Sequence, residues 1–287
     1  MPFTESKSIK SRAVVLGIGL FLWLWPNTAP AEDYLSTADI AAISAGSLGT
    51  VALGEYARHF DSSRSARIEG PLPLETSLQK WLGGTYTSRK TNFLDQRFGG
   101  LITPAVCGLA LISVDLSWPQ GQKNKTTLQD LLLFSAGALA NTGINNIAKG
   151  LVARPRPYVV LYPDELPDHY RDNYAFNHSS FYSGHTSSAF FSATYLNKRI
   201  RAIMRMEMSA DDYHGWRWAP PVLLYGWSTF VAWSRISTYR HYISDVAVGA
   251  LAGYLIAELF FSFNESAEDS PNNQIVSPTM FRITIPL

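Results

Sequence analysis

The sequence has few charged residues and almost no cysteine. Lys, Arg, Asp and Glu make up 16% of its 287 residues, whereas an ordinary soluble domain contains about 25%. The single cysteine, Cys107, excludes an internal disulfide and a zinc site built from several cysteines. The formal net charge of +1 gives no support for nucleic-acid binding. These shortages favour a buried, helical or membrane-embedded protein, although the mean hydropathy of −0.02 leaves solubility open.

Residues 1–31 have the pattern of an export signal. Lys7, Lys10 and Arg12 precede an apolar stretch over residues 13–25, and residues 29–31 read Ala-Pro-Ala, a typical cleavage site. An uncleaved N-terminal membrane anchor is the alternative. Either reading directs the chain to a membrane, and these residues are left out of the fold.

Apolar runs in the rest of the chain predict membrane-spanning helices. Residues 98–114, 131–148 and 218–234 carry no charged side chain, and two weaker runs cover residues 186–197 and 246–257. The longer runs are near the lower limit for crossing a hydrocarbon core of about 30 Å. The prediction is an all-α helical bundle, polytopic in the membrane, with about five spans after the signal segment.

Basic residues predict the topology. The connection over residues 198–217 carries a group of basic side chains: Lys198, Arg199, Arg201, Arg205 and Arg217. Such loops stay on the cytoplasmic side of a membrane, which places residues 149–185 and 235–245 on the outer face. Residues 40–54 are then expected to lie along the membrane surface without crossing it.

The first segment with candidate binding residues covers residues 149–157. Pro155 and Pro157 are expected to end the preceding helix and to hold Arg156 in a fixed pose. A guanidinium group, with the ammonium of Lys149 nearly two turns upstream, makes a suitable clamp for a phosphate. The alternative is a basic flank of a membrane helix, to which Arg154 would also belong.

The second segment is Ser183-Gly184-His185, just before an apolar helical run. Gly184 lets the backbone approach a ligand closely, and the N–H groups at a helix start point toward an anion. His185 titrates near neutrality, as a proton donor must. The alternative is a helix-capping turn with an incidental histidine.

The third segment runs from Ser234-Arg235 to His241 and Asp245. His241 and Asp245 are four residues apart, which places them on one face of a helix. The carboxylate can then accept the Nδ1–H of the imidazole and leave Nε2 as a nucleophile. A purely structural His–Asp pair is the alternative for this spacing.

In order and spacing, the three segments resemble the three-part signature of the type 2 phosphatidic acid phosphatase superfamily. This superfamily includes membrane lipid phosphatases, soluble periplasmic acid phosphatases and vanadium haloperoxidases. The resemblance covers residues 149–245. One position departs from it, because Tyr182 stands where the family commonly has proline before Ser-Gly-His.

The resemblance implies a role for each matching residue. His241 would attack phosphorus, Asp245 would orient it, and His185 would protonate the leaving oxygen and then activate water. The residues implied in phosphate binding are Lys149, Arg156, Ser183, Gly184 and Arg235. Because these cations offset the charge of the phosphoryl oxygens, no cofactor and no metal are expected.

The implied activity is that of a metal-independent phosphatase, which hydrolyses a phosphomonoester or diphosphate through a phosphohistidine intermediate. A lipid phosphate or diphosphate is the favoured substrate. Polyprenyl diphosphate, phosphatidylglycerol phosphate, phosphatidate and lipid A phosphate all fit as substrates. The expected location is the bacterial inner membrane, with the active site facing the periplasm. One alternative is a soluble, periplasmic, broad-specificity acid phosphatase. Another is a vanadium-dependent haloperoxidase, in which His241 would be a vanadium ligand.

The expected division of the chain follows from these assignments. Residues 1–31 form the signal peptide or anchor, and residues 32–97 a surface or peripheral helical region. Residues 98–264 form the catalytic helical bundle. Residues 265–287 form a polar tail whose end, residues 280–285, alternates like a short strand.

Overall fold

The computed structural model describes residues 35, 37–59, 68, 70–83, 98–116, 123–165 and 173–268. These parts of the chain contain helices and connections but no strand, so the predicted all-α fold is confirmed for them. The predicted signal segment and the strand-like end of the tail lie outside the described residues. The domain boundaries after residues 31, 97 and 264 stay predictions.

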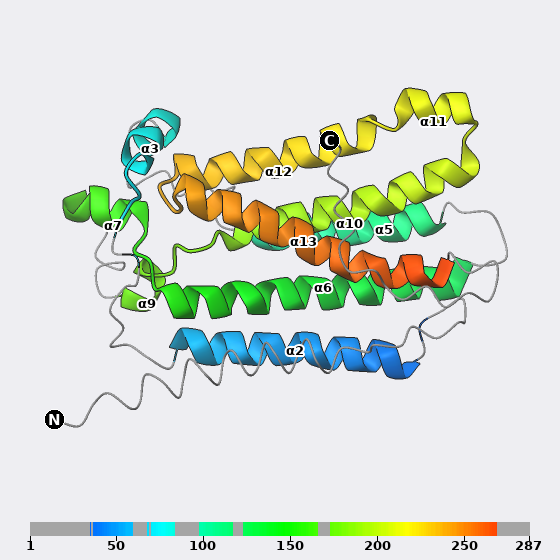
Figure 1. Cartoon of the computed structure of the whole chain (residues 1–287), viewed down its shortest axis with the longest axis horizontal. Coiled ribbons are helices and arrows are strands. Elements are labelled where there is room, and N and C mark those ends of the chain that lie inside the picture. Colours follow the sequence, from blue (N-terminus) through cyan, green and yellow to red (C-terminus); the bar gives the residue numbers. More distant parts are fainter. Residues whose placement is uncertain are drawn as a thin grey trace, which may run out of the picture.

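Long helices lie side by side along one axis and form a bundle (Figure 1). They are α2 (Thr37–His59), α5 (Thr103–Leu116), α6 (Lys123–Val152), α10 (Gly184–Glu207), α12 (Ala219–Ser237) and α13 (Ile243–Glu268). The chain reverses direction between α10 and α12 and again between α12 and α13. As a result, α6 and α12 finish at the same end of the bundle at which α10 and α13 begin (Figure 1). We call this end the motif end.

Short elements connect the long helices. They are α3 (Glu75–Gly83), the π-helical turn η1 (Phe98–Ile102), α7 (Pro157–Leu161), the 3₁₀ turn η2 (Pro163–Glu165), α9 (Tyr174–Asn177) and α11 (Ala210–Trp216). In Figure 1, α3, α7 and α9 gather at the motif end, whereas α11 lies at the opposite end. Among the described residues, the motif end therefore carries most of the irregular backbone, which is where binding and catalytic residues are commonly found.

Small residues let neighbouring helices approach closely. A Cβ atom on Gly143 or Gly150 of α6 would collide with Thr50 or Ala57 of α2, and one on Gly253 of α13 would collide with α10. Close packing at small residues is the usual way in which helices associate within a membrane. It also makes α2 a member of the bundle, although residues 32–97 were expected to form a surface or peripheral helical region.

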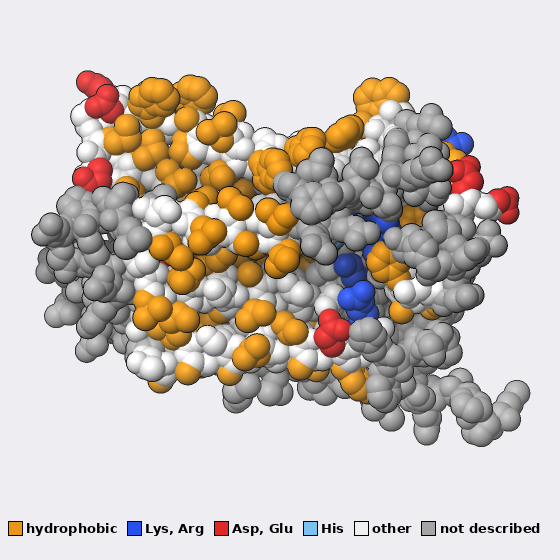
Figure 2. All heavy atoms as spheres, turned by 180° about the vertical axis from the view of Figure 1, so that it is seen from behind, with side chains coloured by type: hydrophobic (Ala, Val, Ile, Leu, Met, Phe, Trp, Pro, Cys, Tyr) orange, Lys and Arg blue, Asp and Glu red, His pale blue; other side chains and the backbone are white. Residues whose placement is uncertain are grey.

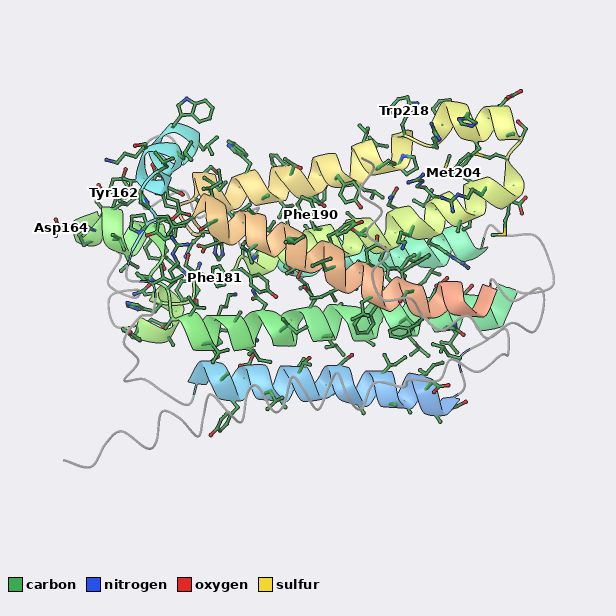
Figure 3. All side chains as sticks on the ribbon, viewed as in Figure 1. Tyr162, Asp164, Phe181, Phe190, Met204 and Trp218 are labelled. Carbon is green, nitrogen blue, oxygen red and sulfur yellow. The ribbon has the colours of Figure 1, made fainter. Side chains whose placement is uncertain are left out.

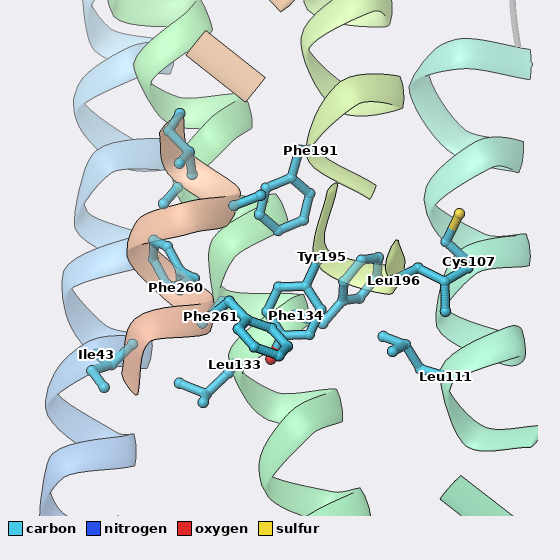
Figure 4. Close-up of a cluster of buried hydrophobic side chains, with 14 residues drawn as sticks. Ile43, Cys107, Leu111, Leu133, Phe134, Phe191, Tyr195, Leu196, Phe260 and Phe261 are labelled. Carbon is cyan, nitrogen blue, oxygen red and sulfur yellow. The ribbon is translucent and has the colours of Figure 1, made fainter. Parts of the chain in front are cut away.

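The centre of the bundle is filled by aliphatic and aromatic side chains (Figure 4). The rings of Phe134 and Tyr195 meet edge to face at 5.4 Å, and Tyr195 and Phe261 do so at 5.2 Å. Cys107 belongs to this same cluster and is buried. Contacts between α6, α10 and α13 therefore fix the mutual position of the helices whose ends form the motif end.

Apolar side chains also cover the outside of the bundle. On the face shown in Figure 2, hydrophobic side chains occupy the broad middle, and Lys and Arg side chains gather toward the motif end. Leu109, Leu223 and Leu251 are 65%, 73% and 57% exposed. A surface with this much exposed apolar area is typical of a protein that meets lipid.

Two helices within the described residues are long and apolar enough to cross a membrane: Thr37–Arg58 and Ile243–Phe263. A shorter apolar helix covers Gly100–Ser113. The helix Thr37–Arg58 includes residues 40–54, which were expected to lie along the membrane surface. Its length and composition allow that segment to cross the membrane instead. The predicted total of about five spans stays a prediction.

Candidate active site

The end of α6 holds Arg156 in place, as the sequence predicts. The helix stops at Val152, Ala153 adopts a left-handed conformation with φ of 48°, and Pro157 opens α7. A proline suits the first position of a helix, where its missing N–H leaves no hydrogen bond unmade. Arg156 is the N-cap of α7, and its backbone N–H donates to the carbonyl oxygen of Asn177 at 2.9 Å. The helix ends before the two prolines, as expected, and the hydrogen bond to Asn177 holds the backbone of Arg156.

The guanidinium of Arg156 is anchored on three sides. Its Nε donates to the carbonyl of Phe176 at 2.9 Å, its Nη2 donates to the hydroxyl of Ser179 at 3.1 Å, and it stacks over the Phe176 ring at 4.3 Å. Burial lowers the pKa of this guanidinium to about 10, and the charges of Arg240 and Arg235 act in the same direction. The group therefore remains charged at neutral pH while having little freedom to move.

The start of α10 brings Lys149 and Gly184 together. A Cβ atom on Gly184 would lie 3.4 Å from the Nζ of Lys149 and only 2.6 Å from the Oδ1 of Asn145. Asn145 also donates from its Nδ2 to the carbonyl of Tyr182 at 2.8 Å. Tyr182, which replaces the family's common proline, is thus tied to α6 through its backbone carbonyl. Gly184 is required by the close approach of the Asn145 side chain.

Ser183 is the N-cap of α10. Its hydroxyl oxygen accepts a hydrogen bond from the Thr186 hydroxyl at 3.0 Å and a longer one from the Thr186 N–H at 3.4 Å. The helix-capping alternative for this segment is therefore present in the structure. A phosphate contact by Ser183 stays a prediction, which the capping role leaves open because the serine O–H remains a donor.

His241 lies in the turn between α12 and α13. Tyr239 adopts a left-handed conformation with φ of 56°, which reverses the chain after α12. The backbone N–H groups of Arg240 and His241 both donate to the carbonyl of Arg235, at 3.1 and 3.2 Å. The turn therefore holds the candidate nucleophile against the last helical residues, which include Arg235.

The imidazole of His241 is oriented by a backbone carbonyl. Its Nδ1 lies 2.7 Å from the carbonyl oxygen of Ser180, whereas the nearest oxygen of Asp245 is 3.9 Å away. The expectation that Asp245 accepts the Nδ1–H directly is therefore wrong in this structure. Because α13 begins only at Ile243, the spacing of four residues does not place His241 and Asp245 on one helix face.

Asp245 binds the side chain of Ser180, the residue whose carbonyl contacts His241. Its Oδ2 accepts hydrogen bonds from the Ser180 hydroxyl at 2.5 Å and from the Tyr242 N–H at 2.9 Å. Asp245 itself is fully buried. The carboxylate thus holds the serine whose carbonyl accepts the hydrogen bond from Nδ1 of His241.

Positive charges surround His241. Burial is the largest cause that lowers the pKa of His241 well below its ordinary value, followed by the charges of Arg156, Lys149, Arg235 and His185. Residues from three separate segments of the sequence are therefore close enough to act on one imidazole. His185 also lies beside η1, because a Cβ atom on Gly100 would be 3.5 Å from its Nε2. In Figure 3, Phe181 marks the same end of the bundle, whereas Met204 lies at the other.

Sequence reasoning missed several residues of this environment. They are Glu75, Asn145, Ser180 and Arg154. Of these, Arg154 was noticed only as a basic residue at the end of a helix. Asn145 could have been noticed as an amide one turn before Lys149 in an apolar helix. Glu75 gave no signal, since it lies far from the three segments in the sequence.

A comparison with protein families matches residues 130–268 to the PAP2 superfamily. This region belongs to the PAP2 superfamily. The resemblance to the type 2 phosphatidic acid phosphatases is thereby confirmed, and the matched PAP2 region contains each residue predicted for the site.

Individual relatives agree with this assignment. Phospholipid phosphatase 1 of Rattus norvegicus is 29% identical over 161 residues, covering 47% of this chain and 55% of that protein. The probable diacylglycerol pyrophosphate phosphatase 1 of Schizosaccharomyces pombe is 33% identical over 82 residues, or 29% of each chain. The chain thus spans about half the length of this rat phospholipid phosphatase.

Among solved structures, the chain is similar to the crystal structure of Aquifex aeolicus LpxE. The similarity covers 68% of this chain and 99% of that chain, with 18% sequence identity and a TM-score of 0.44.

Proposed function

We propose that this PAP2 protein is a metal-independent lipid phosphatase in which His241 is the nucleophile. The observation that supports this proposal most strongly is the hydrogen bond from Nδ1 of His241 to the Ser180 carbonyl. A carbonyl can only accept, so the imidazole proton belongs on Nδ1 and the lone pair on Nε2. A lowered pKa keeps the imidazole neutral, which is the nucleophilic form.

The first chemical step forms a bond between Nε2 of His241 and phosphorus and breaks the bond from phosphorus to the leaving oxygen. His185, whose charge acts on His241, donates a proton to that oxygen, so the lipid leaves as a neutral alcohol or as a protonated phosphate. In the second step His185 takes a proton from water, which attacks the phosphohistidine. Inorganic phosphate and neutral His241 are the products.

Fixed cations do the electrostatic work in this mechanism. Phosphoryl transfer depends on positioning and on charge stabilisation at the equatorial oxygens. Lys149, Arg156 and Arg235 supply that charge close to His241. Arg156 offers a rigid fork held by Phe176 and Ser179, and Lys149 offers a point charge beside Gly184. This set of cations is the reason to expect turnover without a metal ion.

A phosphorylated lipid is the substrate class that suits the molecule best. The outside of the bundle is rich in exposed apolar side chains, and the buried cations lie at one end of it. A lipid can then keep its chains in the membrane while its phosphate reaches His241. The relatives named as phospholipid and diacylglycerol pyrophosphate phosphatases support both monoesters and diphosphates. Polyprenyl diphosphate, phosphatidylglycerol phosphate, phosphatidate and lipid A phosphate therefore remain the substrates to test.

The proposed location is the bacterial inner membrane, with the motif end toward the periplasm. Arg205 lies in the last turn of α10, and Arg217 is the C-cap of α11; both are exposed. These two helix ends lie at the end of the bundle opposite the motif end (Figure 1). Basic loops of membrane proteins stay in the cytoplasm. Arg154, Arg156 and Arg235 of the motif end are buried, so they belong to the site and not to a basic surface loop.

A phosphate-release assay tests this function. Detergent-purified protein is offered each of these lipids and a soluble aryl phosphate, with excess EDTA present. We expect release from at least one lipid at a higher kcat/KM than from the aryl phosphate. We also expect loss of activity in His241→Ala, with the exposed His214→Ala as the matched control. Activity that needs added magnesium, or that persists in a folded His241→Ala protein, would refute the proposal. Release of the protein from cells by osmotic shock without detergent would refute the membrane location.

A further inference from the structure

A buried arginine at the motif end joins two carboxylates that come from distant parts of the chain. Arg154 is 1% exposed, and its Nη1 donates to Oδ1 of Asp245 at 2.7 Å. Its Nη2 forms an ion pair with Glu75 of α3. Its guanidinium also lies over the ring of Tyr242 at 4.1 Å. The fork of an arginine suits this arrangement, since it presents several donors in one plane.

Ser244 completes this group of residues. Its backbone N–H donates to Oε1 of Glu75 at 3.1 Å, and its hydroxyl contacts the same oxygen. Nη1 of Arg154 also donates to the Ser244 hydroxyl at 2.8 Å. We call Glu75, Arg154, Ser244 and Asp245 the buried ion network.

The charges of this network depend on one another. Glu75 is 4% exposed and Asp245 is fully buried. A buried carboxylate is costly unless it is paired and hydrogen-bonded. Burial by itself would raise the pKa of Glu75, but the hydrogen bonds from Ser244 and Leu72 and the charge of Arg154 lower it overall. The carboxylate of Glu75 is therefore ionised at neutral pH, and it shares the arginine with Asp245.

The network reaches the candidate nucleophile through Ser180. Asp245 uses Oδ1 for Arg154 and Oδ2 for the Ser180 hydroxyl. Ser180 donates its backbone N–H to the carbonyl of Arg154 at 3.0 Å and receives the Nδ1–H of His241 on its own carbonyl. Side-chain and main-chain contacts of Arg154 thus both end on the residue that orients His241.

We infer that Arg154 and Glu75 are positioning residues, which fix Asp245 and Ser180 so that His241 presents Nε2 to the phosphate. Both side chains would act through Asp245 and Ser180 and not on the phosphate itself. Glu75 lies outside residues 130–268, the part that matches the PAP2 superfamily. The site is therefore completed by α3, which no part of the family signature contains. This inference rests on the proposed function, because its readout is phosphate release.

The test compares Glu75→Gln and Arg154→Lys with the wild type, using the full chain in detergent and the lipid that the wild type hydrolyses. Glu75→Gln keeps the shape of the side chain but removes its charge. Arg154→Lys keeps the charge but loses the fork that spans two carboxylates. Arg199→Lys is the matched control, because Arg199 forms a buried ion pair with Asp130 at 2.8 Å in a different part of the bundle.

We expect kcat to fall about 10- to 100-fold in both variants, since small displacements of a reacting group have costs of this size. The inhibition constant of inorganic phosphate should stay within about twofold of the wild type, because the phosphate-binding cations are untouched. The double variant should lose less than the product of the two single losses, since both residues act along one path. Arg199→Lys should keep its kcat.

A kcat within about twofold of the wild type in folded Glu75→Gln and Arg154→Lys would overturn the inference. An equal loss in Arg199→Lys would also overturn it, because any buried ion pair would then have the same effect. If neither variant is recovered folded, Ser244→Ala is measured instead, since it removes only hydroxyl contacts with Glu75 and Arg154. A lower kcat supports the inference and an unchanged one rejects it. Failure of the proposed function is distinguishable, because the wild type would then release no phosphate or would need magnesium for release, or activity would persist in His241→Ala.

Discussion

The Nδ1 of His241 donates to the carbonyl oxygen of Ser180 over 2.7 Å, so a backbone group sets the tautomer of the candidate nucleophile. The carboxylate of Asp245 lies behind this contact, hydrogen-bonded to the hydroxyl of the same serine. A side-chain substitution cannot remove the carbonyl that accepts the histidine proton. Substitutions at Ser180 and Asp245 therefore differ in what they disturb.

Ser180→Ala should lower kcat by about 10-fold and leave KM nearly unchanged, because only one link in the support of His241 is lost. Asp245→Asn should lower kcat by about 100-fold or more, since it also removes a counter-charge of Arg154. Steady-state kinetics on the two proteins measure the difference. Ser192→Ala is the matched control, as Ser192 is a buried serine farther along α10. A larger loss in Ser180→Ala than in Asp245→Asn would contradict this order.

Arg156→Lys should reduce kcat/KM by about 100-fold even though the charge is kept. A lysine cannot donate to Phe176 and Ser179 in the same fork geometry, so the phosphate would lose a rigid, directed partner. Inhibition by inorganic phosphate should weaken in parallel. Arg205→Lys, an exposed arginine at the end of α10, is the control that should behave as wild type. Unchanged phosphate inhibition in Arg156→Lys would show that this side chain does not bind the phosphoryl group.

Gly184→Ala should raise KM and reduce kcat/KM by about 10-fold or more. The new methyl group would lie 2.6 Å from Oδ1 of Asn145, so either that side chain or the start of α10 must move. The Nζ of Lys149 would lie 3.4 Å from the same methyl group, so a shift at the start of α10 would also change its position relative to the site. Gly226→Ala is the control within a helix, because nothing lies within 4 Å of its added methyl group. Equal kinetics in the two alanine variants would show that the close approach at Gly184 has no functional role.

The lowered pKa of His241 predicts how stability changes with pH. In the unfolded chain this imidazole titrates near pH 6.5, whereas burial and the surrounding cations keep it neutral to lower pH in the folded protein. The unfolded state therefore binds more protons below about pH 6.5, and stability is lost as the pH falls from there. The contribution is at most about 1.4 kcal/mol per pH unit, and it is absent above that pH.

Thermal unfolding in detergent between pH 8 and pH 5 measures this effect. The Tm of the wild type should fall more steeply below about pH 6.5 than the Tm of His241→Asn. His214→Asn, which changes an exposed histidine of α11, is expected to follow the wild type. Parallel curves for the wild type and His241→Asn would contradict a lowered pKa at His241.

Much of the site could be predicted because its residues occur in short segments with fixed spacing. Two prolines indicated where α6 ends, and the structure places Arg156 at the start of α7 as expected. The helix start after Ser183 was visible from Ser-Gly followed by an apolar run. Such features depend on local backbone preferences, which a single sequence contains.

Other features depend on contacts between distant residues and could not be predicted. Helical spacing suggested a direct contact between His241 and Asp245, but the helix begins after His241, and the carbonyl of Ser180 accepts the hydrogen bond from Nδ1 instead. Glu75 reaches Arg154 from α3, far away in the sequence. The packing of α2 along α6 depends on small residues at matching positions of the two helices, such as Gly143 beside Thr50. The sequence of a segment does not indicate which residues of other helices will contact it.

The most direct test of the central claim is to find the phosphorylated residue during turnover. Wild-type protein mixed with its lipid substrate is quenched in alkali, where phosphohistidine is stable, and its peptides are analysed by mass spectrometry. The account predicts a phosphoryl group on Nε2 of His241, because Nδ1 is hydrogen-bonded to the Ser180 carbonyl. His185→Ala should form little of this adduct, because the leaving oxygen would lack its proton donor. Steady turnover without phosphate on His241, or attachment at Nδ1, would contradict the account.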